Sequence, residues 1–175
     1  MAIRFHFSEK PNAEVRYGIL PTHLGSVIVG ETAVGVCSVA IAGTEHEAYH
    51  SLAAMFPRAN LTRIVGSDAV QQIGAFLANE RRRFDLAVDM VATPFQRLVW
   101  RELGTIGYGE TTTYSTLAAR LGRPNAVRAV ARACATNPVS LIVPCHRVVR
   151  TDGNLAGFRW DVSRKRQLLD MEQRD

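Results

Sequence analysis

The side chains best suited to covalent chemistry lie in one hexapeptide, Pro144-Cys145-His146-Arg147-Val148-Val149. The apolar residues 139–143 before it predict a buried, strand-like segment that Pro144 ends, which places one cysteine at the end of a rigid element. His146 and Arg147 follow the cysteine, and nearby positive charge favours thiolate over thiol. A thiolate is the nucleophile of covalent catalysis at cysteine. A packed core cysteine is the alternative, because free cysteine is often buried, but the proline and the basic neighbours favour a reactive thiol.

Length and composition indicate an ordinary soluble globular protein. The chain has 175 residues, enough for one or two domains, and it is 47% hydrophobic and 21% charged. No apolar run is long enough to span a bilayer, and the first residues lack the apolar region of a signal peptide. The three cysteines have no framework spacing, which predicts reduced thiols in the cytoplasm. Because there is no CxxC motif or Cys/His cluster, we expect neither a metal nor another cofactor.

The positive charge lies almost entirely in the second half of the chain. Residues 1–90 carry 8 Lys and Arg against 9 Asp and Glu, whereas residues 91–175 carry 13 against 7. A basic half beside a near-neutral half predicts a face that binds a polyanion, most often nucleic acid. A solvated basic surface is the alternative, and charge alone does not exclude it.

Residues 1–90 are predicted to form an α/β domain with a small antiparallel sheet. Short stretches rich in β-branched residues, at 14–20, 25–30 and 33–41, predict a three-stranded meander. Thr44 and Glu47 form a capping-box pattern that opens a helix to about Phe56, and a second helix is expected over residues 67–79. Residues 84–91 are expected to be a linker or an edge strand.

Residues 91–175 are predicted to form a mostly α-helical domain with a winged-helix-like arrangement. Thr93-Pro94 suits the start of a helix. That helix is expected to place on its core face Phe95, Leu98, Val99 and Leu103, and on a flank Trp100. Two short helices, at residues 113–121 and 126–135, are separated by a Gly-Arg-Pro-Asn turn, which is the pattern of a helix-turn-helix. Many other αα-hairpins share this pattern.

The second of these short helices has an unusual composition. Five of the ten residues 126–135 are alanine, and its polar side chains are Arg128 and Arg132. Small side chains allow a helix backbone to approach a surface closely, which suits a narrow groove better than side-chain reading of base edges. The alternative is that alanine is simply the best helix former. The two arginines are four residues apart, so they share a face of the helix.

The sequence from about residue 93 to residue 172 resembles the O6-alkylguanine-DNA alkyltransferases, a family of direct-reversal DNA repair proteins. The resemblance is carried, in chain order, by Thr93-Pro94-Phe95-Gln96, Val99-Trp100, Gly109-Glu110-Thr111, Thr113-Tyr114, Ala126-Val127-Arg128-Ala129-Val130, Asn137-Pro138, the Cys145 hexapeptide, Gly157-Phe158-Arg159-Trp160 and Lys165-Arg166-Gln167-Leu168-Leu169-Asp170-Met171-Glu172. Residues 157–160 are closer to the microbial branch, where Gly-Tyr-Arg-Trp is usual and this chain has Phe158. The first half fits the family by length and strand pattern.

The resemblance implies a methylated-DNA–protein-cysteine methyltransferase that acts once per molecule. Cys145 would take the alkyl group of O6-alkylguanine, and possibly of O4-alkylthymine, as a thioether that water does not cleave. His146 would be the base for the thiol proton. Because neighbouring side chains of an extended segment point apart, a water molecule is expected to bridge the two. Glu172 would orient and stabilise the imidazole, as in other nucleophile–base–orienter triads.

The resemblance also implies that the protein binds double-stranded DNA, as a monomer, and that it flips the damaged nucleotide out of the duplex. Arg128 would enter the duplex in its place, and Tyr114 would lie beside the flipped nucleotide and donate a proton to the leaving guanine. Ala129 and Arg132 would contact the DNA, and Asn137 would tie the recognition helix to the active-site segment. The base pocket would be lined by Val148, Gly157, Phe158, Arg159 and Trp160. The alternative roles, without the family context, are that Tyr114 packs at a helix start, Asn137 caps a helix and Glu172 pairs with an arginine.

Three other functions remain for comparison. A lesion-binding relative without transfer activity would lack the acceptor cysteine, and Cys145 argues against it. An ordinary helix-turn-helix regulator would read bases with polar side chains, whereas residues 126–135 are alanine-rich. A cysteine hydrolase would need an oxyanion hole and repeated turnover.

Gly107 stands where the family commonly has proline, which should loosen the turn before Tyr108. Length and Met1 favour a stand-alone repair protein over a fragment of a larger adaptive-response regulator.

Overall fold

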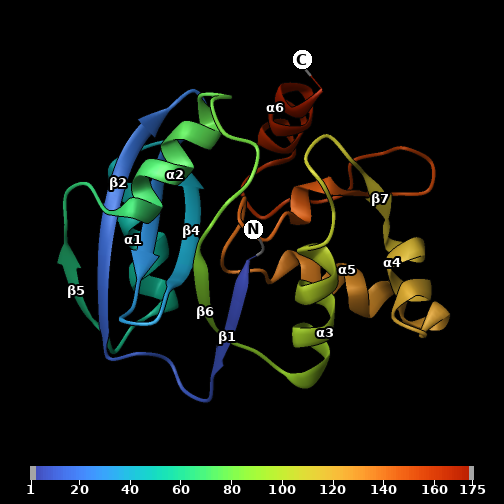
Figure 1. Cartoon of the computed structure of the whole chain (residues 1–175), viewed down its shortest axis with the longest axis horizontal. Helices are drawn as coiled ribbons and strands as arrows, with labels where there is room; N and C mark the ends of the chain where they lie inside the picture. Colours follow the sequence, from blue (N-terminus) through green and yellow to red (C-terminus); the bar gives the residue numbers. More distant parts are fainter. Residues whose placement is uncertain (1–2, 174–175) are drawn as a thin grey trace. The chain divides into compact units, whose positions relative to one another are not determined.

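A computed structural model describes residues 3–173 of the chain. The chain divides into two compact units, one up to Val91 and one from Ala92 onward, and each has its own fold (Figure 1). Among the described residues, no helix has both the length and the apolar character needed to cross a membrane.

The first unit is built on a six-stranded sheet. In spatial order its strands are β1 (Arg4–Ser8), β6 (Ala87–Val91), β4 (Val36–Ala42), β3 (Gly25–Glu31), β2 (Glu14–Thr22) and β5 (Asn60–Arg63). Strands β2, β3 and β4 form the predicted antiparallel meander. Residues Val27, Ile28 and Val29 of β3 are completely buried, as is every residue of β4 to within a few percent. The core of this unit therefore lies on both faces of the two central strands.

The sheet is larger than the meander, and it is mixed. β1 pairs in parallel with β6, and β5 pairs in parallel with β2. Neither strand is apparent in the sequence, because both are short and contain no fully buried residue. The expectation of a linker or edge strand at residues 84–91 is wrong. β6 lies between β1 and β4, with Val36 opposite Val88. In this position Val88 and Met90 are buried. Short parallel strands carry no hairpin signal that would reveal their partners in the sequence.

Two helices and one buried carboxylate complete the first unit. α1 (Glu45–Met55) packs on β3 and β4, and α2 (Asp68–Leu77) packs on β2. The capping box of Thr44 and Glu47 is present as predicted. Asp89 of β6 is 2% exposed and accepts hydrogen bonds from three side chains, those of Ser8, Asn12 and Thr32, at 2.6, 2.9 and 2.7 Å. These bonds offset the cost of burying its charge.

The second unit is mostly helical, as predicted. Its elements are α3 (Pro94–Leu103), β7 (Thr112–Thr113), α4 (Tyr114–Arg120), the 3-10 turn η1 (Pro124–Ala126), α5 (Val127–Ala135), the 3-10 turn η2 (Cys145–Arg147), β8 (Val148–Val149) and α6 (Val162–Glu172). Helices α4 and α5, with η1 between them, form the helix-turn-helix. β7 and β8 pair in parallel as a two-stranded ribbon. This ribbon is the small sheet of the winged-helix-like arrangement.

The core face of α3 differs from the prediction. Leu98 is 43% exposed, whereas Trp100 is 1% exposed. The indole Nε1–H of Trp100 donates to the carbonyl oxygen of Ala133 at 2.9 Å. α3 packs against α5, and the C-terminal turn of α5 supplies the acceptor that a buried indole requires. Trp100 therefore belongs to the core and not to a flank.

The buried segment before the cysteine is a turn and not a strand. Val139, Leu141, Ile142 and Val143 are at most 1% exposed, so the prediction of burial holds. However, the amide of Val143 bonds to the carbonyl of Val139 at 3.0 Å, and Leu141 has a φ of 73°. A short apolar run shows burial without showing which backbone conformation is buried. The cysteine is consequently presented by a tight, apolar turn.

Candidate active site

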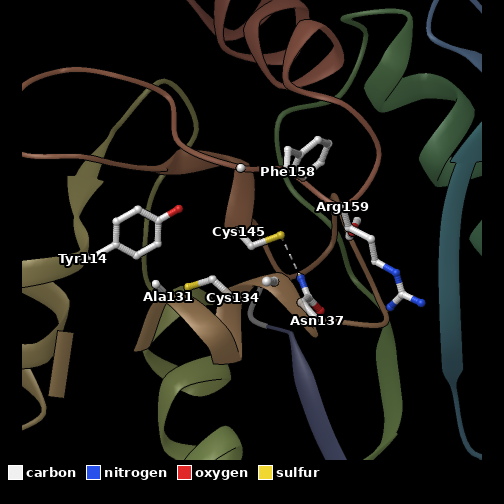
Figure 2. A pocket seen from close by; sticks show the side chains of 10 residues that line it. Tyr114, Ala131, Cys134, Asn137, Cys145, Phe158 and Arg159 are labelled. Atoms are coloured by element: carbon white, nitrogen blue, oxygen red, sulfur yellow. Dashed lines mark hydrogen bonds between the residues drawn. The ribbon is translucent and has the colours of Figure 1, made fainter. Parts of the chain in front are cut away.

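Cys145 is the first residue of η2, and it is held by the side chain of Asn137, which lies two residues after the end of α5. The Asn137 Nδ2 group donates to Sγ of Cys145 at 3.3 Å and to the carbonyl oxygen of Val143 at 2.7 Å (Figure 2). Its Oδ1 atom accepts the amide hydrogen of Val139 at 3.0 Å. Asn137 is 1% exposed and Cys145 6% exposed. One amide side chain thus joins the segment after α5 to the cysteine turn.

The cysteine is a thiol at rest. Burial raises the pKa of the Cys145 thiol, and it does so by more than the hydrogen bond from Asn137 and the charge of Lys165 lower it. The expectation that Arg147 would stabilise a thiolate is wrong, because the guanidinium points to a carboxylate instead. The sulfur therefore needs a base before it can act as a nucleophile.

His146 provides a basic nitrogen in the same turn. Its Nε2 atom lies 2.8 Å from Oε1 of Glu172, at the end of α6, and the two side chains are 0% and 1% exposed. An ionised carboxylate can only accept, so the hydrogen must sit on Nε2 and the lone pair on Nδ1. Among residues 3–173, Nδ1 has no hydrogen-bond partner although it is buried. The geometry leaves this nitrogen available to accept a proton.

Besides His146, two further groups donate hydrogen bonds to the carboxylate of Glu172. Arg147 donates through Nε to Oε2 and through Nη2 to Oε1, both at 2.9 Å, and the amide of Gly109 donates to Oε2 at 3.2 Å. The Nη1 group of Arg147 donates to the carbonyl of Ile106 at 2.7 Å. The expected pairing with His146 and the alternative pairing with an arginine are both present. The bidentate geometry is the strong form of an arginine–carboxylate bond.

These contacts determine the charges of Glu172, Arg147 and His146. Burial acts to raise the pKa of Glu172, but the hydrogen bonds from His146 and Arg147 outweigh it and hold that pKa at about 2. Burial lowers the pKa of His146 from its ordinary value, and Glu172 offsets only part of this effect. At neutral pH the site holds a carboxylate, a guanidinium and a neutral imidazole.

Lys165 of α6 belongs to the site although the sequence reasoning assigned it no role. The side chain is completely buried, and Nζ donates to the carbonyl oxygens of Val148 and Leu155, both at 2.6 Å. Its charge favours the thiolate of Cys145. A lysine in a helix with polar neighbours carries no sequence signal of burial. The structure shows it as a link between β8, the loop that follows and α6.

A cavity of about 20 Å³ opens at the cysteine (Figure 2). It is lined by Tyr114, Ala131, Cys134, Ala135, Asn137, Ser140, Cys145, Gly157, Phe158 and Arg159. Three of the five predicted pocket residues therefore line it. The other two, Val148 and Trp160, are not among its lining residues in the described part of the chain. The carbonyl oxygen of Val148 accepts a hydrogen bond from Lys165, and the indole Nε1–H of Trp160 donates to Oγ of Ser140 at 2.9 Å. Ser140 and Cys134 are lining residues that sequence reasoning missed.

Tyr114, the first residue of α4, stands on one side of the Cys145 sulfur, with Phe158 and Arg159 on the other (Figure 2). Burial raises the pKa of Tyr114 to about 12, and the neighbouring thiols of Cys134 and Cys145 act in the same direction. The phenol consequently keeps its hydrogen at neutral pH and can act as a donor in the cavity.

The predicted DNA-contacting residues lie on the opposite face of α5 from its buried residues. Arg128, Ala129 and Arg132 are exposed, whereas Val130, Ala133 and Cys134 are buried. Within residues 3–173, neither arginine side chain forms a hydrogen bond or an ion pair. One helix thus presents two unpaired cations outward and Cys134 to the cavity.

Comparison with known proteins gives one consistent result. Residues 94–174 match the family model described as 6-O-methylguanine DNA methyltransferase, DNA binding domain. The chain is 42% identical over 163 residues to the bifunctional transcriptional activator/DNA repair enzyme Ada of Escherichia coli. It is 46% identical over 107 residues to the methylated-DNA–protein-cysteine methyltransferase of Mycobacterium tuberculosis. The crystal structure of M. tuberculosis OGT in complex with DNA superposes with a TM-score of 0.79 at 34% identity.

The extent of these matches differs. The match to Ada includes 92% of this chain but 46% of Ada, and the match to the mycobacterial methyltransferase includes 61% of this chain and 65% of that protein. The chain thus spans about half to two thirds of the curated relatives. The superposition on M. tuberculosis OGT covers 91% of this chain and 93% of the solved one. Both units therefore share the relative's fold, an α/β unit followed by a helical unit.

The charge of Glu172 predicts a pH-dependent stability. Because its pKa is held at about 2 in the folded protein, its stabilising contribution is full above the unfolded value near 4.5 and is lost as pH falls toward 2. Glu172→Gln should lower the free energy of unfolding at pH 7 by about 3 kcal/mol, because it leaves Arg147 buried without its partner. The difference from the wild type should close between pH 4.5 and pH 2 in urea unfolding curves.

The matched control is Glu102→Gln. Glu102 pairs with Arg120 at 3.6 Å, but both side chains are partly exposed, so its loss should cost no more than about 1 kcal/mol. A Glu172→Gln protein as stable as the control at pH 7, or a difference that persists unchanged at pH 2, would contradict the charge state given above.

Proposed function

The chain belongs to the O6-alkylguanine-DNA alkyltransferase family, and we propose that it repairs O6-alkylguanine in double-stranded DNA by transferring the alkyl group to Cys145. The observation that carries this proposal is the placement of the Cys145 thiol in a small cavity, with a neutral imidazole on the next residue, His146. That imidazole is oriented by a carboxylate and has an unused lone pair. The family relationship supplies the substrate, and the site supplies a nucleophile with its base.

The first step is removal of the thiol proton. The Sγ–H bond of Cys145 breaks, and the proton passes to Nδ1 of His146, either directly or through one water molecule. Burial opposes charge on both groups, so the pair of charges needs support. Glu172 stabilises the imidazolium, while Asn137 and Lys165 favour the thiolate. This is the division of labour of a nucleophile–base–orienter triad.

The second step is a direct displacement. The thiolate donates an electron pair to the alkyl carbon, a carbon–sulfur bond forms, and the bond to guanine O6 breaks with its electrons moving to the base. Tyr114 donates a proton to the departing guanine, and its pKa of about 12 ensures that the proton is present at neutral pH. The product is a thioether. Because water does not cleave it, each protein molecule acts once.

Access to the base requires DNA binding and nucleotide flipping. We propose that α5 lies in a narrow groove, where its alanines, including Ala129, permit close approach. The exposed cations of Arg128 and Arg132 face the nucleic acid. A cavity of about 20 Å³ is close to the size of one water molecule. Gly157 and Arg159 are exposed and lie outside the helices and strands, so we propose that this segment moves when a base enters.

The same proposal assigns a domain to each unit. Residues 1–90 form the α/β domain, and residues 91–175 form the DNA-binding and alkyl-acceptor domain. We infer that the protein acts as a monomer in the cytoplasm. The three cysteines are all free thiols, which is the usual state in a reducing compartment.

The acceptor assignment predicts the behaviour of Cys145→Ala. This protein should lose alkyl transfer completely and still bind an O6-methylguanine duplex, because the cavity wall and the helix-turn-helix remain. With a labelled duplex in excess, the wild type should gain one label per molecule, and peptide mass spectrometry should place it on Cys145. Cys134→Ala is the control, because it removes the other thiol of the cavity. Label on Cys134 or Cys37 in the Cys145→Ala protein, or more than one turnover, would refute the proposal.

A separate prediction concerns Arg128. Flipping a nucleotide costs a few kcal/mol of stacking and pairing, and an inserted arginine recovers part of this cost. Arg128→Ala should therefore slow repair of duplex DNA by roughly 10-fold or more and change the reaction with free O6-methylguanine base very little. Lysine should rescue only partly, because it lacks the planar, multi-donor guanidinium. Single-turnover rates on both substrates test this, with Arg132→Ala as the control; equal losses on duplex and free base would exclude the role.

A further inference from the structure

Ser140 lies in the buried turn between Asn137 and Cys145, and its hydroxyl is in contact with Trp160. The indole Nε1–H of Trp160 donates to Oγ of Ser140 at 2.9 Å. Ser140 is 1% exposed and Trp160 is 8% exposed, so water does not compete freely for this bond. The guanidinium of Arg159 covers the ring of Trp160 at 4.9 Å from its centroid. Trp160 therefore stands behind the wall of the cavity, and Ser140 forms part of that wall.

The hydrogens of this pair can be assigned from chemistry. An indole N–H is a donor only, so Ser140 Oγ must be the acceptor of this bond. A serine hydroxyl has one hydrogen, and the bond to Trp160 leaves that hydrogen unused. The Trp160 contact also restricts rotation of the hydroxyl, because the indole hydrogen occupies one of the oxygen lone pairs. The Ser140 hydrogen is therefore directed toward another acceptor.

The cavity at Cys145 offers such an acceptor in the cysteine sulfur. Ser140 and Cys145 line the same cavity. Asn137 gives the sulfur one hydrogen only, because its second amide hydrogen goes to the carbonyl of Val143. A hydrogen bond from the Ser140 side chain is one of the causes that lower the pKa of the Cys145 thiol. The cavity thus holds two donor groups for the sulfur, the amide of Asn137 and the hydroxyl of Ser140.

We propose that Trp160 and Ser140 form a donor relay to Cys145, in which Trp160 fixes the Ser140 hydroxyl and Ser140 donates a hydrogen bond to Sγ. Ser140 is then a catalytic residue, since it touches the reacting atom, and Trp160 is a positioning residue that acts through it. For DNA repair this inference rests on the proposed function. The hydrogen bond itself affects any reaction in which the Cys145 sulfur is the nucleophile.

The relay has opposite effects on two quantities. It increases the fraction of sulfur present as thiolate, and it decreases the nucleophilicity of each thiolate, because nucleophilicity falls as thiol pKa falls with a coefficient of about 0.4–0.5. The first effect is larger at neutral pH, where the thiol predominates. Removing one hydrogen bond to the thiolate should therefore slow reaction of the sulfur by roughly fourfold to fifteenfold. The loss should shrink as pH rises and the thiolate becomes the main form in both proteins.

The experiment uses methyl iodide, which is small and needs no base recognition. The sulfur forms a bond to the methyl carbon, iodide leaves with the electron pair, and the thiol proton passes to His146. Rates at Cys145 are followed by peptide mass spectrometry across a pH series. The proteins compared are the wild type, Ser140→Ala, Trp160→Phe and the double variant. Trp100→Phe is the control, because it removes the other buried indole donor of the same unit, which bonds to Ala133.

Ser140→Ala should show the full loss at neutral pH, and Trp160→Phe a smaller loss with the same dependence on pH. The double variant should match Ser140→Ala, because Trp160 acts through the hydroxyl. Trp100→Phe should follow the wild-type profile. Equal rates for Ser140→Ala and wild type at all pH values would overturn the relay, as would a loss that is constant with pH or additive losses in the double variant. If Ser140→Ala fails to fold, Trp160→Phe with a wild-type profile overturns it.

The methyl iodide measurement tests the relay independently of the proposed function. A pH-dependent loss with methyl iodide in a protein that does not repair alkylated DNA would support the relay and refute the repair activity. Repair of a duplex with no effect of Ser140→Ala on the methyl iodide profile would do the reverse.

Discussion

The carboxylate of Glu172 is buried at the end of α6, and the geometry of the second unit depends on how it is neutralised. Burying an ion without partners costs several kcal/mol. Here Arg147, His146 and the amide of Gly109 all donate to it. Arg147 in turn binds the carbonyl of Ile106. The Glu172 carboxylate therefore joins the last helix, the cysteine turn and the segment before β7. Its loss would leave all three poorly positioned.

The same burial that makes this network necessary also shapes the reactivity. Removal from water raises the pKa of Cys145 and lowers the pKa of His146, so the resting pair is neutral. Charge separation between them is favoured by fixed groups, among them Glu172 on the histidine side and Asn137 and Lys165 on the sulfur side. Preorganised donors of this kind act more strongly in a dry site than in water. Under the proposed function, a neutral resting state also protects an acceptor that reacts only once from unproductive alkylation.

Much of this arrangement could be predicted, because some residue patterns have one local solution. The capping residues Thr44 and Thr93 each begin a helix as expected, and the reciprocal bonds predicted at Thr44 form at both. The glycine-containing turn between α4 and α5 gives the helix-turn-helix. The pairing of His146 with Glu172 came from the family resemblance, since 26 residues separate them in the chain.

Other features could not be predicted, because they depend on tertiary neighbours. Residues 139–143 are apolar enough for either a strand or a buried turn, and Leu141 with its positive φ selects the turn. The direction of the Arg147 side chain is decided by the carboxylate of Glu172, which lies on α6. Lys165 is buried because two carbonyl groups with no side-chain signature, those of Val148 and Leu155, accept from it. Ser140 is an ordinary polar residue until Trp160 is placed behind it.

Glu172 holds His146 as a neutral imidazole with its hydrogen on Nε2 and its lone pair on Nδ1. Nitrogen-15 NMR of the histidine-labelled protein measures this directly, with the His146 signals assigned by their loss in His146→Asn. We expect a protonated Nε2 and an unprotonated Nδ1 at pH 7, and a ring that stays neutral below the ordinary histidine pKa of 6.5 because burial lowers its pKa. A hydrogen on Nδ1, or an imidazolium at neutral pH, would contradict it, because His146 could then no longer accept the thiol proton.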